Sequence, residues 1–362
     1  MCLCNWHGTG GAQLNAGMLV EAFRTRGYDA DLGFLFEREP ESRHGVEDYF
    51  VVSAEAPRRP WNWPEFIAGC LREIGGRHPS AIFGFQPMSN VVGALVQAGR
   101  AGRRFVATQR NPAGEQSVQV GRLERLIGGT DLYSANIAVS QAVADSFAAY
   151  GRGYRDKLRV VPNATPALLD TGEAAAECRR LLGITATGPV LGCVSRLHPQ
   201  KNLRFAMDVA ARLPSAQLYL AGVGPEEEAL RAHAQRIGAA ERVHFVGSLA
   251  GDDVARLYRA LDVVLFPSLY EGFGRTLVEA MALGTPVVAN DIPVVREVAG
   301  DAALRFPLVV DQWVAGVTTL LADAAFRHAI VQAGHQRAAG FSVDKMVDGY
   351  LDAAGLARHK HG

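Results

Sequence analysis

Apolar runs of strand length alternate with amphipathic stretches of helix length along almost the whole sequence. This alternation is typical of a parallel sheet whose strands are buried by the helices that connect them. It therefore predicts an α/β fold. The second half shows the pattern most clearly, with strands expected at 190–195, 217–221, 243–246, 263–266 and 286–289 and helices at 203–212, 225–237, 252–260, 276–283 and 294–299.

The first half repeats the pattern less regularly. A turn that contains Gly8, Gly10 and Gly11 leads into an expected helix at 13–26, and strands are expected at 31–36, 81–85, 105–108, 137–139 and 158–161. Segment 38–64 lacks a clear periodicity and is expected to form an irregular loop. Only residues 1–7 precede the glycine turn, so either the chain starts inside a longer protein or one edge of this sheet is weak.

With 362 residues, the chain is about twice as long as a typical domain, which favours two domains. The polar stretch from Asn163 to Glu173 is rich in helix breakers and is the expected linker, which places the domains at 1–170 and 171–342. Lys plus Arg and Asp plus Glu both total 37, so bulk charge gives no reason to bind nucleic acid or an anionic membrane. No apolar run approaches the roughly 20 residues of a membrane span, and a cytoplasmic protein is expected.

The most informative segment lies between residues 270 and 284. It follows an expected buried strand and turns through Gly272 and Gly274 directly into a helix, whose free N–H groups and positive dipole can bind a phosphate. Glu271 precedes this helix and Glu279 lies in its first turns. Carboxylates beside an anion site suit hydroxyl groups, which a sugar joined to a nucleotide offers. The alternative is a helix with two solvated glutamates.

A second segment, 195–202, leaves the first strand of the same domain. It carries Arg196 and Lys201, which could neutralise a diphosphate from two sides. The alternative is an exposed loop with two solvated cations. Its place after a parallel strand favours the ligand site, because open α/β sheets bind ligands at the carboxyl ends of their strands.

Together with their neighbours, these segments resemble the retaining glycosyltransferases of family four, which have the GT-B fold of two facing Rossmann-like domains with a cleft between them. The resemblance rests on an ordered series of motifs: Gly8-Thr9-Gly10-Gly11-Ala12, Ala138-Val139-Ser140, Val160-Val161-Pro162-Asn163, Arg196-Leu197-His198-Pro199-Gln200-Lys201-Asn202, Ala221-Gly222-Val223-Gly224-Pro225, Phe245-Val246-Gly247, Phe266-Pro267-Ser268 and Glu271 to Glu279. It implies that the first domain shapes the acceptor site, that the second binds the donor, and that a last helix in 343–362 packs back on the first.

The resemblance also implies roles for individual residues. Glu271 would hold hydroxyls of the donor sugar, and Glu279 would accept hydrogen bonds from the ribose. Arg196 and Lys201 would stabilise the departing diphosphate. The remaining expected donor contacts are backbone N–H groups near Phe273, Gly274 and Leu277, the turn residues Gly10 and Gly11, and Gly247 and Ser248 near the base.

No metal or other cofactor is expected. Loss of a nucleoside diphosphate needs little beyond leaving-group stabilisation and a positioned acceptor. Asp29-Ala30-Asp31 matches the metal-binding motif of the other common glycosyltransferase fold, but it lies between a helix and a strand and is interpreted as two surface aspartates. The five cysteines show no zinc-site spacing, and Cys70, Cys178 and Cys193 are expected in the cores.

Arg110 occupies the place where many relatives carry a histidine that contacts the donor sugar. It could bind an anionic group of donor or acceptor, or hold the cleft through a salt bridge. The cluster of Arg100, Arg103 and Arg104 is compatible with lipid headgroups or with a solvated turn, so peripheral membrane contact stays open.

These observations predict a metal-independent retaining glycosyltransferase that moves a sugar from a nucleotide-diphosphate-sugar to a hydroxyl acceptor, with bacterial surface-glycan or glycolipid synthesis as the expected setting. The alternatives are a GT-B-fold epimerase or phosphorylase and a catalytically silent nucleotide-sugar-binding protein. A dehydrogenase is less favoured, because Gly222-Val223-Gly224 lacks the third glycine of a dinucleotide-binding motif. The base, the sugar, the acceptor and the oligomeric state stay open.

Overall fold

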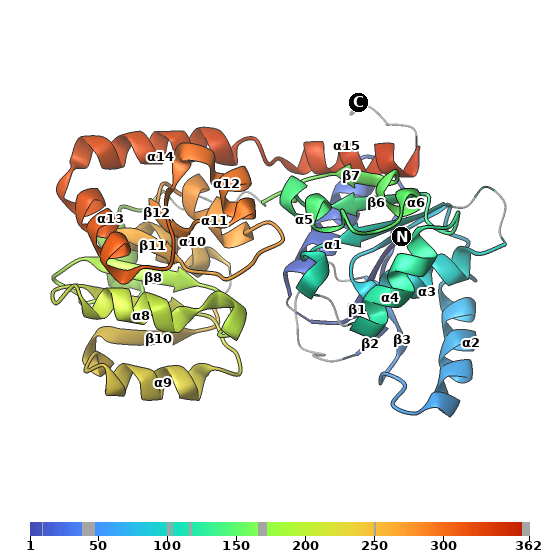
Figure 1. Cartoon of the computed structure of the whole chain (residues 1–362), viewed down its shortest axis with the longest axis horizontal. Helices are drawn as coiled ribbons and strands as arrows, with labels where there is room; N and C mark the ends of the chain where they lie inside the picture. The colour runs from blue at the N-terminus through green and yellow to red at the C-terminus, as the bar shows by residue number, and fades with distance from the viewer. Residues whose placement is uncertain are drawn as a thin grey trace. The chain divides into compact units, whose positions relative to one another are not determined.

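The computed structural model describes residues 1–8, 10–37, 48–99, 102, 104–115, 118–165, 172–249 and 251–356. The chain forms two compact units (Figure 1). Unit 1 comprises Met1–Pro166 and Phe341–Gly362, and unit 2 comprises Ala167–Gly340. Each unit contains one parallel sheet with helices, which confirms the predicted α/β class.

The sheet of unit 1 has the order β3-β2-β1-β4-β5-β6-β7. Its strands are β1 (Cys2–Trp6), β2 (Leu32–Phe36), β3 (Tyr49–Ser53), β4 (Ala81–Gly84), β5 (Arg104–Gln109), β6 (Ala135–Ala138) and β7 (Leu158–Val160). Alternate residues of β1 enter two different cores, because successive side chains of a strand point to opposite faces. Cys2 and Cys4 pack on the side of α1 (Gly11–Thr25), and Leu3 packs on the side of α2 (Trp63–Glu73) and α3 (Pro87–Gln97).

The sheet of unit 2 has the order β10-β9-β8-β11-β12-β13. Its strands are β8 (Val190–Val194), β9 (Gln217–Ala221), β10 (Val243–Gly247), β11 (Val263–Phe266), β12 (Val287–Asn290) and β13 (Leu304–Phe306). One core packs under α8 (Leu203–Ala211), α9 (Glu227–Arg236) and α13 (Val310–Ala322). The other helices of this unit are α7 (Ala175–Leu181), α10 (Asp252–Ala260), α11 (Arg275–Ala282), α12 (Pro293–Ala299) and α14 (Ala324–Ala338).

The last helix, α15 (Val343–Ala354), belongs to unit 1. Met346, Val347 and Tyr350 are buried in the core beside α1. Arg26, at the end of α1, reaches α15 through ion pairs of 2.6 Å to Asp344 and 2.5 Å to Asp348. The remaining helices of unit 1 are α4 (Val118–Gly128), α5 (Gln141–Ser146) and α6 (Arg152–Arg155).

Two expectations for the first half were wrong. Segment 38–64 is not one irregular loop, because β3 lies within it and α2 begins at Trp63; residues 38–47 lie outside the described part. The short first strand is not a weak edge, because β1 pairs on both sides with β2 and β4.

Of the predicted arginine cluster, Arg100 and Arg103 lie outside the described residues. The Arg104 side chain donates a hydrogen bond to the Ala354 carbonyl of α15.

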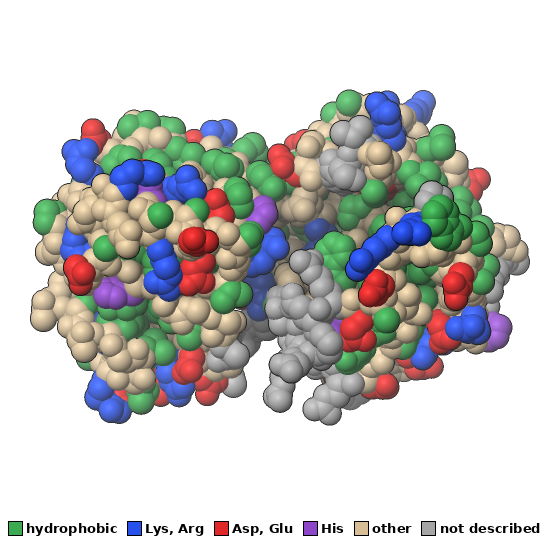
Figure 2. Space-filling model, turned by 90° about the horizontal axis from the view of Figure 1, so that it is seen from below, with side chains coloured by type: hydrophobic (Ala, Val, Ile, Leu, Met, Phe, Trp, Pro, Cys, Tyr) green, Lys and Arg blue, Asp and Glu red, His purple; other side chains and the backbone are tan. Residues whose placement is uncertain are grey.

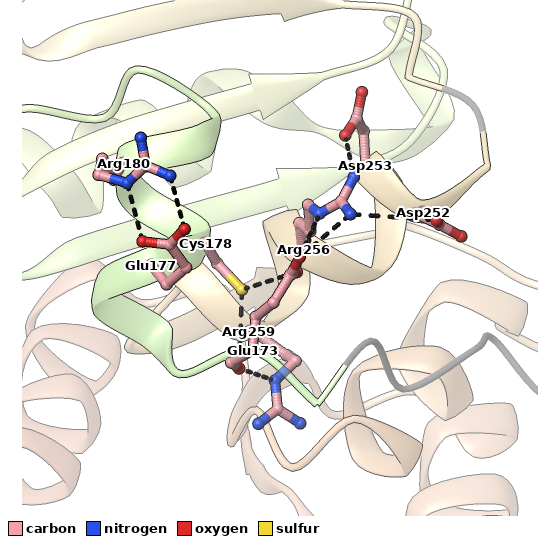
Figure 3. Close-up of polar contacts among 8 residues, drawn as sticks. All are labelled: Glu173, Glu177, Cys178, Arg180, Asp252, Asp253, Arg256 and Arg259. Carbon is pink, nitrogen blue, oxygen red and sulfur yellow. Dashed lines mark hydrogen bonds and ion pairs between the residues drawn. The ribbon is translucent and has the colours of Figure 1, made fainter.

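The segment that enters unit 2 is fixed by a cluster around Glu173 (Figure 3). The Arg256 guanidinium of α10 donates to both Glu173 carboxylate oxygens, at 2.9 and 3.1 Å, and also pairs with Asp253 at 3.0 Å. Arg259 donates to the Glu173 backbone carbonyl at 2.8 Å. These contacts tie the end of the predicted linker to α10. Residues 166–171 of that linker lie outside the described part of the chain.

Charged side chains of both signs are interspersed with hydrophobic ones on the surface seen in Figure 2, in keeping with a formal net charge of zero. Across the described ranges, no single helix is both long and apolar enough to cross a membrane. One bent pair, Val310–Ala322 with Ala324–Ala354, meets the length and composition criteria but turns by 100° at its break.

Candidate functional site

The candidate site begins where the connections of the second sheet change direction. From β8 the chain moves outward to β9 and β10, whereas from β11 it moves the other way to β12 and β13. Because β8 and β11 are parallel neighbours, the loops that leave their carboxyl ends start side by side. Open α/β sheets bind ligands at such a point. The two segments singled out in the sequence are these two loops.

Hydrogen bonds join the two loops. The Leu269 N–H donates to the Gln200 carbonyl at 2.8 Å, and the Gln200 side-chain amide donates to the Tyr270 carbonyl at 2.9 Å. From the end of β12, the Asn290 side-chain amide donates to the Ser268 carbonyl at 2.9 Å. The backbone of residues 268–270 is therefore held both by the loop after β8 and by the end of β12.

Lys201 and Glu271 meet between these loops. The Lys201 Nζ lies 2.5 Å from Glu271 Oε1, and the two side chains are only 16% and 9% exposed. The same ammonium lies 5.9 Å from the ring centroid of Phe266, at the end of β11. A small pocket adjoins Lys201 and is lined mainly by the ends of β8 and β11, with Ser195, Pro267, Ser268 and Thr276. The structure thus brings together two of the predicted charged residues, 70 positions apart in sequence.

The start of α11 depends on a glycine. Gly274 is the N-cap and has φ +84°, in the left-handed region that favours glycine. Its carbonyl accepts a hydrogen bond from the Leu277 N–H at 3.0 Å, so the Leu277 amide is already engaged in the first helical turn. Phe273 and Leu277 are buried. Arg275 and Thr276, the first two residues of the helix, are half-buried. The predicted anion contacts at this helix start stay a prediction.

Glu279 is held within unit 2 by two neighbours. Its Oε1 accepts from Arg275 Nε at 2.6 Å, one helical turn earlier, and its Oε2 accepts from the Tyr258 hydroxyl of α10 at 2.9 Å. Tyr258 is fully buried. Burial raises the pKa of the Tyr258 hydroxyl well above its ordinary value, and the nearby Glu279 carboxylate adds to the shift. The raised pKa keeps the Tyr258 hydroxyl protonated at neutral pH, as its role of donor to Glu279 requires.

The other predicted residues of unit 2 lie at the same edge of its sheet. Arg196 is exposed on the loop after β8, and none of the ion pairs found in the described ranges includes it. Gly247 ends β10 with φ +77°, and its carbonyl accepts from the Gly222 N–H at 2.7 Å. Ser248 follows and is exposed. Among the described residues, no hydrogen bond or ion pair is found that joins Arg196 or Glu279 to the Lys201–Glu271 pair. The structure therefore brings only two of the four predicted charged residues into contact.

The predicted residues of unit 1 occupy the carboxyl edge of its own sheet. Gly10 is the N-cap of α1 and Gly11 is its first residue. Arg110 follows β5; its guanidinium donates to Asn163 Oδ1 at 3.0 Å and lies 5.5 Å from the ring centroid of Phe85. This contact of Arg110, with Asn163 after β7, is with a neutral amide.

The aspartates of the Asp29-Ala30-Asp31 motif do not converge. Asp29 is exposed, and Asp31 forms an ion pair of 3.6 Å with Arg77. Within the described ranges, no group of three His, Cys, Asp or Glu side chains is arranged to hold a metal ion. All five cysteines are free and buried, which confirms the prediction of core positions for Cys70, Cys178 and Cys193.

Comparison with known proteins identifies the family. The pattern of the family described as Glycosyl transferases group 1 matches residues 176–337, and that of Glycosyltransferase Family 4 matches residues 9–166. A D-inositol 3-phosphate glycosyltransferase of Salinispora arenicola is 34% identical over 95% of this chain and 84% of its own length. The one from Segniliparus rotundus is 30% identical over 92% of this chain and 80% of its own length. This chain belongs to glycosyltransferase family 4.

Solved structures agree with the fold of this glycosyltransferase. HepE of Anabaena, in complex with UDP-glucose, aligns with 98% of this chain and 100% of its own, with a TM-score of 0.82 and 23% identity. Sucrose-phosphate synthase of Thermosynechococcus elongatus aligns with 97% of this chain and 98% of its own, with a TM-score of 0.80 and 20% identity. The predicted GT-B fold and its Rossmann-like parallel sheets are thereby confirmed.

Sequence reasoning missed the residues that hold the predicted ones in place. Gln200 joins the two loops, Asn290 fixes the second loop, and Tyr258 binds Glu279. Only Arg275 carried a local signal, because it lies one helical turn before Glu279 and can pair with it at that spacing. The others act across the fold, and their partners are not apparent from their neighbours in sequence.

Proposed function

We propose that this glycosyltransferase moves a sugar from a nucleotide-diphosphate-sugar to a hydroxyl acceptor, retains the anomeric configuration and requires no metal ion. The observation that supports this most directly is the Lys201–Glu271 pair, 2.5 Å long and nearly buried, at the switch point of the second sheet beside the start of α11. A cation and a hydroxyl-binding carboxylate at a helix start suit a phosphorylated sugar.

The donor chemistry assigns a task to each residue of unit 2. Lys201 and the exposed Arg196 would stabilise the negative charge that grows on the diphosphate as the glycosyl bond breaks. Amide groups between Phe273 and Leu277 would bind phosphate and sugar oxygens at the start of α11. Glu271 would accept hydrogen bonds from sugar hydroxyls and Glu279 from the ribose, with the base near Gly247 and Ser248. In unit 1, Gly10 and Gly11 would contribute backbone groups to the diphosphate.

In this scheme, Arg196 and Lys201 take the place of a divalent ion. The scheme therefore predicts that transfer does not depend on a metal. Transfer measured in excess EDTA should proceed at the same rate as in added Mg²⁺ or Mn²⁺. A rate that depends on an added divalent ion would show that Arg196 and Lys201 do not suffice for the leaving group.

The donor is best sought among UDP-sugars, because HepE is described in complex with UDP-glucose. A panel of UDP-glucose, UDP-N-acetylglucosamine and GDP-mannose, first by thermal shift and then by product analysis, would identify it, since a bound donor raises the melting temperature. NMR of the product tests retention, because a retaining enzyme keeps the anomeric configuration of the donor. Conversion of the donor to its epimer without any acceptor would contradict the proposed transfer.

For the acceptor, a phosphorylated polyol is the first candidate. Two relatives that cover more than nine-tenths of this chain are named D-inositol 3-phosphate glycosyltransferases. In unit 1, Arg110 supplies a half-buried guanidinium that could receive a phosphate on the acceptor. Bacterial surface-glycan or glycolipid synthesis stays a prediction from family resemblance. Transfer to inositol 3-phosphate, compared with transfer to inositol and to lipid-linked glycans, distinguishes these acceptors.

Substitution tests the site itself. Lys201→Ala should lower kcat by about 100-fold or more, because it removes a cation from the developing charge. Arg212→Ala is a matched control, since Arg212 is an exposed arginine of the same unit that pairs with Asp311 instead. Equal kcat values for Lys201→Ala and Arg212→Ala would overturn the proposed site.

A further inference from the structure

The Gly222-Val223-Gly224 motif, which a dinucleotide site would have used, lies beside the loop that carries Arg196. Pairing between β8 and β9 continues past the ends of both strands. The Ser195 N–H donates to the Ala221 carbonyl at 2.9 Å, and the Leu197 N–H donates to the Val223 carbonyl at 3.0 Å. Residues 195–197 thus run alongside residues 221–223 as an extension of the sheet.

This extension holds the backbone around Arg196. Leu197 is 1% exposed and belongs to the core of unit 2, whereas Arg196 is exposed. Leu197 therefore anchors the loop in the core directly beside Arg196, whose own side chain is exposed to solvent. The position of Arg196 is therefore set by the backbone on both sides of it.

Only glycine permits the close approach of these two segments. A Cβ atom at Gly222 would overlap the Ser195 carbonyl oxygen. A Cβ atom at Gly224 would overlap the Leu197 carbonyl oxygen and lie 2.8 Å from the Leu197 nitrogen. All of these are backbone atoms, which cannot move aside as a flexible side chain can. The Leu197 carbonyl is also held from the other side, because it accepts from the Glu226 N–H at 3.1 Å.

We propose that Gly222 and Gly224 are positioning residues for Arg196, which hold its loop at the distance from β9 that places the guanidinium at the donor diphosphate. This inference rests on the proposed function, because it assigns Arg196 the donor phosphates. It gives the glycine motif a role in the geometry of the leaving group rather than in nicotinamide binding.

Gly224 allows a clean test. Gly222 has φ +133°, so any side chain there strains the backbone as well as the contact, whereas Gly224 does not have a positive φ. Gly224→Ala therefore perturbs only the close approach to Leu197. A shift of the loop by an ångström should lower kcat about 10- to 100-fold, with a smaller effect on the KM for the donor, because Arg196 acts on charge that develops in the transition state.

A matched control exists at the opposite end of β8. A Cβ atom at Gly188 would overlap the Ser215 carbonyl oxygen, a backbone clash of the same kind, and Gly188 also lacks a positive φ. Gly188 lies before β8, at the amino edge of the sheet, away from the loop that carries Arg196. Gly188→Ala should lower the melting temperature but leave kcat within about twofold of the wild type when assayed well below that temperature.

A double-substitution cycle separates positioning from general damage. If Gly224 acts through Arg196, then Gly224→Ala added to Arg196→Ala should change kcat by less than about twofold, because the positioned group is already gone. If both substitutions lower kcat and their effects multiply, the positioning inference is overturned. A Gly224→Ala enzyme with wild-type kcat overturns it as well.

Two further measurements keep the inference testable. If Gly224→Ala does not fold, Leu197→Val trims the anchor of the loop instead, and its smaller loss of kcat should also vanish in the Arg196→Ala background. If Arg196→Ala alone retains wild-type kcat, the proposed role of Arg196 fails, and the positioning inference fails with it. A loss in Arg196→Ala beside unchanged kcat in Gly224→Ala and Leu197→Val would instead overturn only the positioning role.

Discussion

The carboxyl group of Glu124 makes the stability of unit 1 depend on pH. Glu124 lies on α4 and is fully buried. Its Oε1 accepts from the Asn90 side-chain amide of α3 at 2.8 Å and from the Gln109 side-chain amide at the end of β5. These partners are neutral, so they compensate only partly for the loss of water. Burial raises the pKa of Glu124 from 4.5 to about 7.

The direction of the effect follows from linkage. Between pH 4.5 and 7 the folded protein keeps a proton on Glu124 that the unfolded chain has lost, so the unfolding free energy decreases as pH rises through this window. With these two pKa values, the loss between pH 5 and pH 8 is about 2.5 kcal/mol. Glu124→Gln keeps an acceptor oxygen for Asn90 and Gln109 but carries no titrating proton. The variant should therefore lack this part of the pH dependence.

Urea unfolding at pH 5, 6, 7 and 8, followed for the transition that includes unit 1, measures the effect. The unfolding free energy of the wild type should fall relative to that of Glu124→Gln by about 2.5 kcal/mol from pH 5 to pH 8. Glu65→Gln, at an exposed position of α2 in the same unit, is the control and should follow the wild type. Parallel pH profiles for the wild type and Glu124→Gln would refute the raised pKa.

Three further results are expected. Tyr258→Phe removes a buried donor from Glu279, so it should lower the unfolding free energy by about 1–3 kcal/mol and raise the donor KM; an unchanged KM would argue against Glu279 as a ribose contact. Glu173→Gln should lower the melting temperature of unit 2, and the difference from wild type should shrink in 1 M salt, because the contact with Arg256 is a charge pair. Gln200→Ala should reduce kcat without a comparable loss of melting temperature, as a thermal scan beside the kinetic assay would show, because its side-chain amide links the two site loops.

The regular core elements could be predicted from the sequence because their signals are local. β9 (Gln217–Ala221), α10 (Asp252–Ala260) and β11 (Val263–Phe266) have the predicted bounds. The two strands are apolar runs. Both are inner strands of the sheet, and such strands are mainly apolar because helices bury both of their faces. By contrast, β3 (Tyr49–Ser53) was missed. It is an edge strand and only half buried, so its identity depends on pairing with β2 rather than on its own pattern.

The candidate site shows a similar division. Glu271 and Lys201 stood out because each lies on a loop after an apolar strand, and the order of the sheet then places those loops together. The engagement of the Leu277 amide by Gly274 was not foreseen, since a tight first turn leaves no mark in residue type. The contacts of Tyr258, Gln200 and Asn290 with the site span 21 to 70 residues of sequence, and no periodicity indicates such a contact.

The burial of the Lys201–Glu271 pair explains why the two loops are joined so firmly. Side chains that are 16% and 9% exposed have lost most of their water, and either charge alone would be costly at this position. The pair therefore requires a fixed spacing between the two loops. The hydrogen bonds of Gln200 with Leu269 and Tyr270 provide it. A lysine held in this way has few rotamers left to lose. In the proposed function, it would therefore bind the donor phosphate with little reorganisation. Arg196 differs, because its side chain is exposed and only its backbone is held by neighbouring residues. Its contribution to kcat should therefore depend more on the spacing between β8 and β9 than the contribution of Lys201 does.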